Sequence, residues 1–406
     1  MSFAETIAIN QMPGAGNDAF GRLRTSGTGS RLDTEFIYDK QVDFFDEVTT
    51  NGTVTHNANG RDLTLALTSA ADGNEAHMAS HPVPYTPGNS QLIDITGTLD
   101  LADIGTGAVE VFLRSSISGT PADLTTVSQA SWLTMTSGVD WSTSHIFQMD
   151  FQSLKVGTIR FNIVADGVPT QVAQINNDNL RSGGYWQTPS LPVFWHIHIV
   201  GTETIMEIGY GDANNAIGFR YTLPTANASA TMLAVCATVK SEGGKPLAEI
   251  EGLPRVADNG GTVVSAASTT VLQPIISIRP RATFQSLPNL GIAFPKGYTS
   301  QTNNPIKLAV IIGGTLTGPT WADVDTSNSM MEFDVASSAI SGGRIVGSDY
   351  QSTVGKNKAD TAQGLLGKSV LWDRQSTETG IFTLAALKTT GTTADILAAI
   401  NWSEIR

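Results

Sequence analysis

The chain has 406 residues, of which 40% are hydrophobic and only 15% are charged. The length suggests two or three domains rather than one core, and the low charge content, together with 40 glycines, is typical of a β-rich protein. The formal net charge of -13 argues against general nucleic-acid binding, because that function needs clustered Lys and Arg side chains to displace counterions.

The single cysteine, Cys236, rules out an intrachain disulfide and suggests synthesis in a reducing compartment. The first ten residues, MSFAETIAIN, lack the basic and apolar regions of a signal peptide. No apolar run approaches the roughly 18 residues that would span a bilayer. We therefore expect no membrane span and no secretory leader.

Residues 1–30 are rich in glycine and small polar residues, as in GAGNDAFG and TSGTGS, and show no hydrophobic period. This composition predicts an extended N-terminal arm rather than a domain. One octet of the arm, AFGRLRTS (19–26), places two arginines beside two apolar residues in an otherwise acidic protein. The residues of interest are Phe20, Arg22, Leu23 and Arg24.

From residue 31 to about 245, short apolar runs alternate with turn clusters, which predicts a large β-sandwich. The segment TVTHNANGRDLTLALTS carries an Asn-Gly turn signal, and IRFNIVADGVPTQVAQI reads as a hairpin around Asp166 and Gly167. VFWHIHIV and ETIMEIGYG are expected to form the next strand pair.

Residues 246–266 contain two prolines and little periodicity, which predicts a linker between domains. Strand patterns resume in residues 267–406, so a second β-sandwich is expected there. Near the end, TTADILAAINW has a threonine cap and helically spaced apolar residues, which predicts one short C-terminal helix. The expected fold class is all-β, with two β-sandwich or jelly-roll domains.

The motif HIH brings His196 and His198 to one face of a predicted strand, since residues two apart share a face. This is the most metal-like spacing in the chain, but zinc needs three or four ligands. The alternative is a polar strand face whose opposite side carries Trp195, Ile197 and Ile199. We expect no metal and no cofactor, with His196 and His198 as the candidates if one is bound.

The stretch GGYWQTPSLPVFWHI (183–197) concentrates Tyr185, Trp186 and Trp195. Such aromatic residues occur in sandwich cores, in protein interfaces and in glycan-binding surfaces, and all three interpretations are open. Carboxylates abound in the first domain, but most lie beside Gly, Asn or Ser, where Asp stabilises turns. A glycosidase would need two carboxylates facing each other across a cleft. The candidate carboxylates are Asp140, Asp150, Asp166, Glu203, Glu207 and Asp212.

Several segments spread over nearly the whole chain resemble a recurring pattern in virion structural proteins of tailed bacteriophages and environmental viruses. They include AFGRLRTS (19–26), EFIYDKQVDFFDE (35–47), YTPGNSQLIDITGTL (85–99), CATVKSEGG (236–244) and ILAAINWSEI (396–405). The resemblance implies a non-enzymatic place in a virus particle that is assembled in the host cytoplasm. It also fits β-sandwich subunits that oligomerise through flexible arms.

On this basis we expect a homo-oligomer, with a trimer favoured, on the particle exterior in the tail, fibre base or adsorption apparatus. The arm is expected to lay Phe20 and Leu23 into a groove of a neighbouring subunit, while Arg22 and Arg24 reach carboxylates there. The alternative for the arginines is an ion pair within their own subunit. Rival functions are a capsid decoration or head-fibre protein, a host-glycan-binding module and a virion glycanase.

Overall fold

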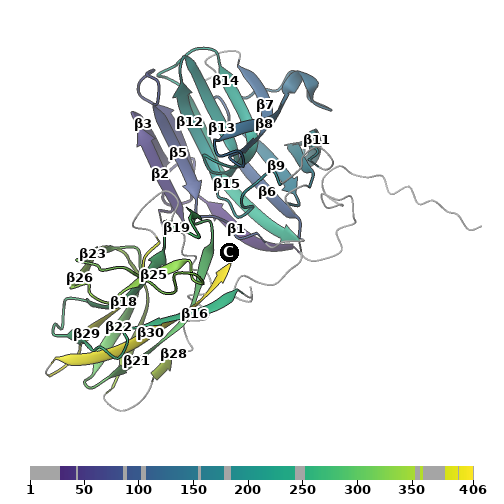
Figure 1. Ribbon diagram of the computed structural model, residues 1–406. Coiled ribbons are helices and arrows are strands. Elements are labelled where there is room, and N and C mark those ends of the chain that lie inside the picture. Colours follow the sequence, from purple (N-terminus) through teal and green to yellow (C-terminus); the bar gives the residue numbers. More distant parts are fainter. Residues whose placement is uncertain are drawn as a thin grey trace, which may run out of the picture. The chain divides into compact units, whose positions relative to one another are not determined.

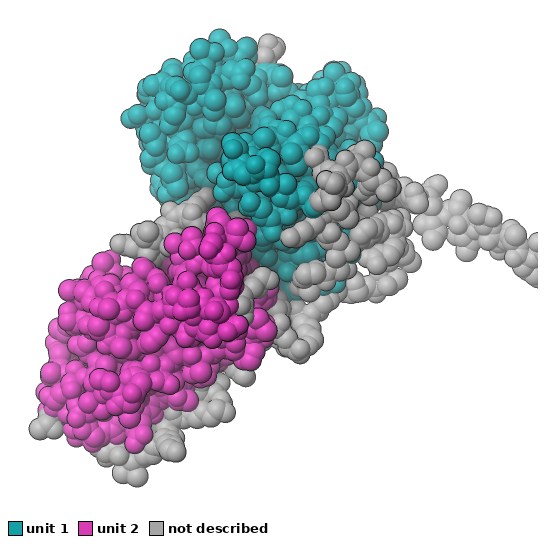
Figure 2. Space-filling model, in the orientation of Figure 1, with its two compact units in different colours: residues 1–244 teal, residues 245–406 magenta. Residues whose placement is uncertain are grey.

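The computed structural model describes residues 28–42, 44–85, 89–101, 107–153, 157–177, 184–242, 252–352, 357–359, 380–391 and 393–405. These residues form strands almost throughout, with one short 3-10 turn, η1 (Gln129–Ser131), among them. The all-β prediction is therefore confirmed. The chain divides into two compact units, residues 1–244 and residues 245–406 (Figure 2).

The first unit is built on two antiparallel sheets (Figure 1). One has eight strands in the order β11-β10-β9-β6-β15-β4-β3, with β1 paired to β15 beside β4. Its strands are β1 (Thr28–Glu35), β3 (Gly52–Asn57), β4 (Asp62–Leu67), β6 (Gln91–Thr98), β9 (His145–Phe151), β10 (Ile159–Ala165), β11 (Val168–Ile175) and β15 (Thr231–Glu242).

The other sheet has seven strands in the order β2-β5-β12-β13-β14-β7-β8. They are β2 (Phe45–Thr50), β5 (Glu75–Ser80), β7 (Ala108–Ser115), β8 (Ala122–Ser128), β12 (Val193–Val200), β13 (Glu203–Gly211) and β14 (Ala216–Leu223). The order is not sequential, because β12 to β14 are inserted between β5 and β7. Residues far apart in the chain thus become neighbours on one sheet face.

The core of the first unit lies between the two sheets, as alternation along each strand requires. On β12, Trp195, Ile197 and Ile199 are buried in this core. The ring of Phe147 on β9 packs 4.9 Å from the ring of Phe219 on β14, which joins one sheet to the other. The two sheets therefore form one sandwich, with polar side chains on both outer faces.

The predicted hairpins of this unit are confirmed. Strands β10 and β11 pair around Asp166 and Gly167, whose φ angles are 51° and 76°. Two successive positive φ angles define the turn that matches the twist of a two-residue hairpin, and an Asp-Gly pair accepts them. Strands β3 and β4 pair around the Asn-Gly signal, and β12 pairs with β13.

The second unit is a smaller sandwich with two main sheets. Five strands follow the order β16-β30-β21-β28 with β17 beside β30: β16 (Leu253–Asp258), β17 (Val264–Ala266), β21 (Ile292–Thr302), β28 (Asn357–Ala359) and β30 (Ala394–Ile405). Six follow β24-β25-β18-β29-β22-β27: β18 (Gln273–Pro280), β22 (Ile306–Ile312), β24 (Ala322–Asp323), β25 (Met331–Asp334), β27 (Arg344–Gln351) and β29 (Phe382–Lys388). Two short pairs complete it: β19 (Thr283–Phe284) with β20 (Leu287–Pro288), and β23 (Thr315–Thr317) with β26 (Ala339–Ser341).

The predicted C-terminal helix is wrong, because the segment from Ala394 onward belongs to the long strand β30. Burial alternates along β30, with Ile396, Ile400 and Trp402 in the core. The strand pairs with β16 and β17 on one side and with β21 on the other. Hydrogen bonding on both edges overrides a helical pattern of modest propensity.

The predicted linker 246–266 also needs correction, because β16 and β17 lie within it and belong to the second unit. Pro254 suggested a break, but β16 is an edge strand, where a residue without an N–H is tolerated. At the other end, the predicted arm 1–30 is shortened, because β1 already begins at Thr28.

Candidate functional site

A row of five charged or titratable side chains crosses the outer face of the seven-stranded sheet. The strand register places these residues directly opposite one another on β5, β12, β13, β14 and β7. We call them the polar row: His77, His196, Glu207, Arg220 and Glu110. Side chains opposite one another in a sheet have Cβ atoms about 5 Å apart, so the row is contiguous.

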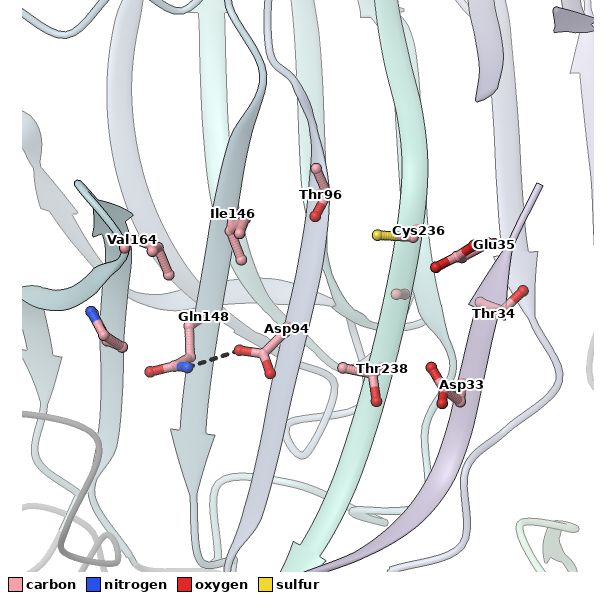
Figure 3. A pocket seen from close by; sticks show the side chains of 13 residues that line it. Asp33, Thr34, Glu35, Asp94, Thr96, Ile146, Gln148, Val164, Cys236 and Thr238 are labelled. Atoms are coloured by element: carbon pink, nitrogen blue, oxygen red, sulfur yellow. Dashed lines mark hydrogen bonds between the residues drawn. The ribbon is translucent and has the colours of Figure 1, made fainter. Parts of the chain in front are cut away.

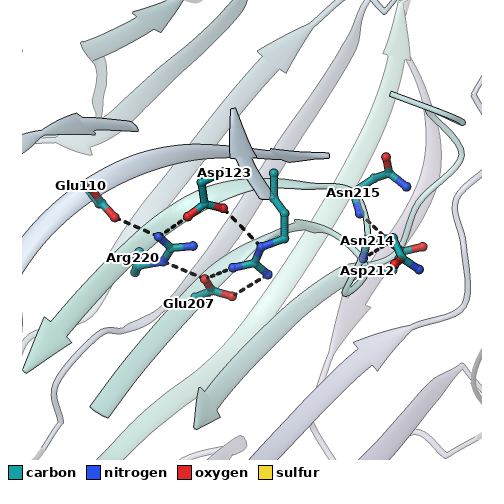
Figure 4. A network of polar contacts seen from close by, with 8 residues as sticks. Glu110, Asp123, Glu207, Asp212, Asn214, Asn215 and Arg220 are labelled. Atoms are coloured by element: carbon teal, nitrogen blue, oxygen red, sulfur yellow. Dashed lines mark hydrogen bonds and ion pairs between the residues drawn. The ribbon is translucent and has the colours of Figure 1, made fainter. Parts of the chain in front are cut away.

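The centre of the polar row is the buried carboxylate of Glu207. Its Oε1 accepts hydrogen bonds from Nη2 of Arg114 at 2.7 Å and from Nε of Arg220 at 2.8 Å. Arg220 also donates through Nη1 to Glu110 at 2.9 Å and to Asp123 at 2.7 Å (Figure 4). Charged side chains from four strands, β7, β8, β13 and β14, are thereby joined into one ion-pair network.

Burial and charge act in opposite directions on Glu207. Desolvation raises the pKa of its carboxyl, but Arg114 and Arg220 outweigh that effect and hold the pKa at about 2. For Arg220, desolvation lowers the pKa, while Glu207 and Asp123 raise it above its usual range. The network is therefore ionised under all ordinary conditions, and Glu207 is not a proton donor at neutral pH.

Two glycines make room for aromatic rings beside the network. Gly209 and Gly218 lie opposite each other on β13 and β14, one row along from Glu207 and Arg220. A Cβ on Gly218 would lie 3.1 Å from the ring of Phe112, and one on Gly209 would lie 3.0 Å from the ring of Phe194. The Phe112 ring in turn lies 4.4 Å from the guanidinium carbon of Arg220, within cation–π range.

Three histidines gather at one end of the polar row. The rings of His196 and His198 stack with centroids 4.1 Å apart, and the His77 ring lies 4.6 Å from that of His196. Desolvation by burial is the largest effect on each, and it lowers the pKa of His196 to about 4 and those of His77 and His198 to about 3. All three imidazoles are neutral at pH 7.

The outer face of the eight-stranded sheet carries a groove of about 340 Å³ (Figure 3). Strands β1, β6, β9 and β15 form its floor, and Gly167 and Pro169 of the β10–β11 hairpin close one side. Three carboxylates lie along it, those of Asp33, Glu35 and Asp94. We call this feature the acidic groove.

The charges of the acidic groove are only partly balanced. Asp94 accepts a hydrogen bond from Gln148 at 2.7 Å and pairs with Lys240 at 3.1 Å. Asp33 and Glu35 are exposed and form no ion pair with another described residue. The thiol of Cys236 lies beside them, and desolvation, with smaller contributions from Glu35 and Asp33, raises its pKa.

The aromatic residues singled out in the sequence are not surface residues. Tyr185, Trp186 and Trp195 are fully buried in the core of the first unit, and Nε1 of Trp195 donates to the backbone carbonyl of Thr96 in the opposite sheet at 3.3 Å. The interpretation of these rings as a glycan or interface site is therefore wrong. Their apolar area stabilises the sandwich instead.

Two further groups of predicted site residues have different outcomes. The arm residues Phe20, Arg22, Leu23 and Arg24 lie outside the described residues. His196 and His198 do lie on the polar face of β12, as expected, and the structure adds Glu207 beside them. One ring nitrogen of each histidine and one carboxylate oxygen of Glu207 lie within 4.8 Å of one another.

Three of the carboxylates considered for glycoside hydrolysis have structural contacts. Oδ1 of Asp140 accepts from the backbone N–H of Ser142 at 3.0 Å. Oδ1 of Asp212 accepts from the backbone N–H of Asn214 at 2.9 Å, as Figure 4 shows. Asp150 is buried and pairs with Arg160 at 2.6 Å. These contacts agree with the turn interpretation for Asp140 and Asp212.

Sequence reasoning missed Arg114, Arg220 and Asp123 altogether. Arg114 lies in a strand whose alternation was visible, so its outward orientation could have been predicted. The strands of Asp123 and Arg220, β8 and β14, show no regular alternation of buried and exposed residues. What the sequence did not reveal was the register that brings β7, β13 and β14 together across about 110 residues.

Comparisons with known proteins give no family. No protein-family model matches the chain, and no curated protein sequence matches it. Among solved structures, an endo-1,3-beta-glucanase from Streptomyces sioyaensis aligns with a TM-score of 0.32 at 10% identity, over 54% of this chain and 98% of that one. A winged bean acidic lectin aligns with a TM-score of 0.22 at 10% identity, over 54% of this chain and 100% of the lectin. A legume lectin-like domain from Entamoeba histolytica aligns with a TM-score of 0.20 at 14% identity, over 51% of this chain and 95% of that domain.

These TM-scores are too low to carry an argument about function. The described part of the chain contains no helix with the length and hydrophobicity needed to cross a membrane. The candidate sites therefore have to be judged by their own geometry and charge, which are those of the polar row and the acidic groove.

Proposed function

We propose that this chain is a non-enzymatic structural protein on the exterior of a tailed-bacteriophage particle, and that its copies assemble through the N-terminal arm. The tail, fibre base or adsorption apparatus is the favoured location, and a trimer is the favoured state. Two lines of support converge on this proposal. They are the resemblance of segments across the whole chain to virion structural proteins, and the acidic groove described above.

The acidic groove is the observation that carries the assembly mechanism. Asp33 and Glu35 present exposed carboxylates on a sheet face, whereas Arg22 and Arg24 are the only charged residues of the octet 19–26. Guanidinium groups bind carboxylates with two parallel hydrogen bonds. Ile146, 39% exposed, and Val164 also line the groove and offer apolar contact to Phe20 and Leu23.

A second copy fits the groove better than the same copy does. The octet lies just before β1, and β1 runs from Thr28 toward the groove at Asp33 and Glu35. At about 3.3 Å per residue, the groove begins roughly 16 Å along β1. A segment of the same chain would have to reverse direction within a few residues, whereas the octet of a neighbour would not.

Charge reversal on both sides tests this assembly mechanism. We expect the double variants Arg22→Glu/Arg24→Glu and Asp33→Lys/Glu35→Lys each to weaken self-association by at least about 10-fold, since close charge pairs at interfaces couple strongly. Combining all four changes should restore it. Mass is measured by size-exclusion chromatography with light scattering over a concentration series. Glu203→Lys, an exposed charge on β13 outside the groove, is the control for Asp33→Lys.

Unchanged mass in both double variants would overturn the arm mechanism, and so would the absence of rescue in the fourfold variant. The same chromatography with disrupted phage particles tests the location. A stable closed oligomer of the chain alone supports a tail or fibre-base protein. Oligomerisation only on capsid components supports the decoration alternative, and association with no particle component contradicts the virion proposal.

Glycan binding is the second candidate, and the acidic groove also favours it. Carboxylate, amide and hydroxyl groups converge there from Asp94, Gln148, Thr96 and Thr238, and such groups hydrogen-bond sugar hydroxyls. Binding of host-envelope glycans that Gln148→Ala abolishes, in a variant that still self-associates, would favour this function over arm docking.

A further inference from the structure

We propose that His196, His198 and Glu207 form a binding site for a divalent transition-metal ion, with Zn²⁺ as the expected occupant. The proposal goes beyond the assembly function and does not depend on it. It rests on the arrangement of the polar row, which brings two imidazoles and a carboxylate together on the outer face of β12 and β13.

The backbone places the three side chains without loops. His196 and His198 are two residues apart on β12, so both project from the same face, and Glu207 is the direct partner of His196 on β13. Their candidate ligand atoms lie within 4.8 Å of one another. A tetrahedral zinc ion with bonds of about 2.0–2.1 Å needs them somewhat closer, which rotation of the side chains can provide.

Each of the three residues has a lone pair available. Nδ1 of His198 is buried and has no hydrogen-bond partner among the described residues, and a buried polar atom in that state is unfavourable. Nε2 of His196 lies 3.1 Å from Oε2 of Glu75, so an N–H there leaves Nδ1 with the lone pair. Glu207 uses Oε1 for its two short ion pairs, and its Oε2 accepts only a 3.4 Å hydrogen bond.

The contact between Glu75 and His196 matches the surroundings of known zinc ligands. A zinc-binding imidazole usually donates its other N–H to a carboxylate or carbonyl, which fixes the orientation of the ring. Glu75 is in that position on the neighbouring strand β5. The fourth zinc position is then open to water or to a second carboxylate oxygen.

The charge of the cluster also favours a divalent cation. Its four carboxylates face two guanidiniums, so the cluster carries a net charge of minus two when the histidines are neutral. Arg114 and Arg220 repel a cation, but Glu110 and Asp123 offset them. A dication would make the cluster neutral and would connect β12 to β13 by a direct bond. The four carboxylates are those of Glu75, Glu110, Asp123 and Glu207.

The test is equilibrium binding of Zn²⁺ to the full-length chain after treatment with a chelator. We expect one bound zinc per chain by elemental analysis, and a rise in Tm of about 5–10 °C at a zinc concentration 100-fold above Kd, reversed by EDTA. Substitution with Co²⁺ should give the strong visible absorption of a four-coordinate site. His198→Gln should weaken binding roughly 100-fold.

His145→Gln is the matched control, because His145 lies on β9 in the other sheet. This variant should bind zinc with the same affinity as the wild-type protein. Wild-type protein that binds no zinc would overturn the proposal. So would binding that His198→Gln leaves unchanged. If His198→Gln does not fold, zinc binding by His196→Gln and the Co²⁺ spectrum of the wild-type protein test the site instead. A zinc site on a surface histidine gives no four-coordinate Co²⁺ spectrum.

Discussion

Several buried carboxylates in this protein are ion-paired or hydrogen-bonded to other side chains. Glu207 faces Arg114 and Arg220, and Asp150 faces Arg160. In the second unit, Oε1 of Glu404 accepts from Ser329 at 2.6 Å and from the indole N–H of Trp402 at 3.0 Å. A buried charge is tolerated only when it is paired or hydrogen-bonded, so these residues depend on one another.

The isosteric change Glu207→Gln tests this dependence. It removes the negative charge and leaves two guanidiniums facing each other in a largely buried place. We expect a loss of about 3–5 kcal/mol in the free energy of unfolding of the first unit, as for other broken buried pairs. Urea unfolding in EDTA, followed by tryptophan fluorescence, measures it.

Glu110→Gln is the comparison for Glu207→Gln, because it breaks one ion pair of the same network at a side chain that is 26% exposed. A partly exposed pair contributes about 1 kcal/mol or less. Equal losses in the free energy of unfolding for the two variants would show that burial of Glu207 does not determine how much it stabilises the first unit.

At the scale of elements, strand pairing rather than helix propensity determined the secondary structure near the C-terminus. The segment that reads as a helix, 392–402, instead enters β30 at Ala394, and β30 is paired on both edges. The segment that reads as a linker supplies β16, and Pro254 is accommodated because β16 lies at an edge. Both errors arose where partners far away in sequence determined the structure.

Two neighbouring residues of β30 distinguish a strand from a helix in solution. Ile396 is buried in the core of the second unit, whereas Leu397 faces the other way and is half-buried. Ile396→Ala should lower the free energy of unfolding of the second unit by about 2–5 kcal/mol. Leu397→Ala should cost clearly less. Both are measured by denaturant titration, and a reversed order would contradict the strand.

At the scale of the whole molecule, the acidic groove contains its own reporter. Cys236 is the single cysteine of the chain and lines the groove beside Asp33 and Glu35. Since burial raises the pKa of this thiol, alkylation is best followed at about pH 9, where more thiolate is present. The rate of labelling then reports whether the groove is covered.

Self-association through the arm should protect Cys236. We expect alkylation to slow as protein concentration rises, by about 10-fold or more when the oligomer is complete, because a covered thiol reacts only during dissociation. The variant Arg22→Glu/Arg24→Glu should label at one rate at every concentration. Protection that persists in this variant would place something other than the arm over the groove.

Several features of the protein followed from the sequence alone. Alternating apolar residues predicted the all-β class, and Asp166-Gly167 predicted a hairpin, because side-chain period and turn chemistry are local properties. The opposite faces of β12, with Trp195 inside and His196 outside, also followed from period two. The placement in a virus particle is a prediction from resemblance and awaits the particle experiment.

The tertiary structure decided what depends on register between distant strands. Only pairing of β13 with β14 and of β14 with β7 places Glu207, Arg220 and Glu110 in one row. Only packing of the two sheets buries Trp186, which the sequence left between core and surface. The physical reason is the same in each case: alternation fixes which face a side chain takes, whereas its neighbours depend on strand order, which is set by the packing of the whole unit.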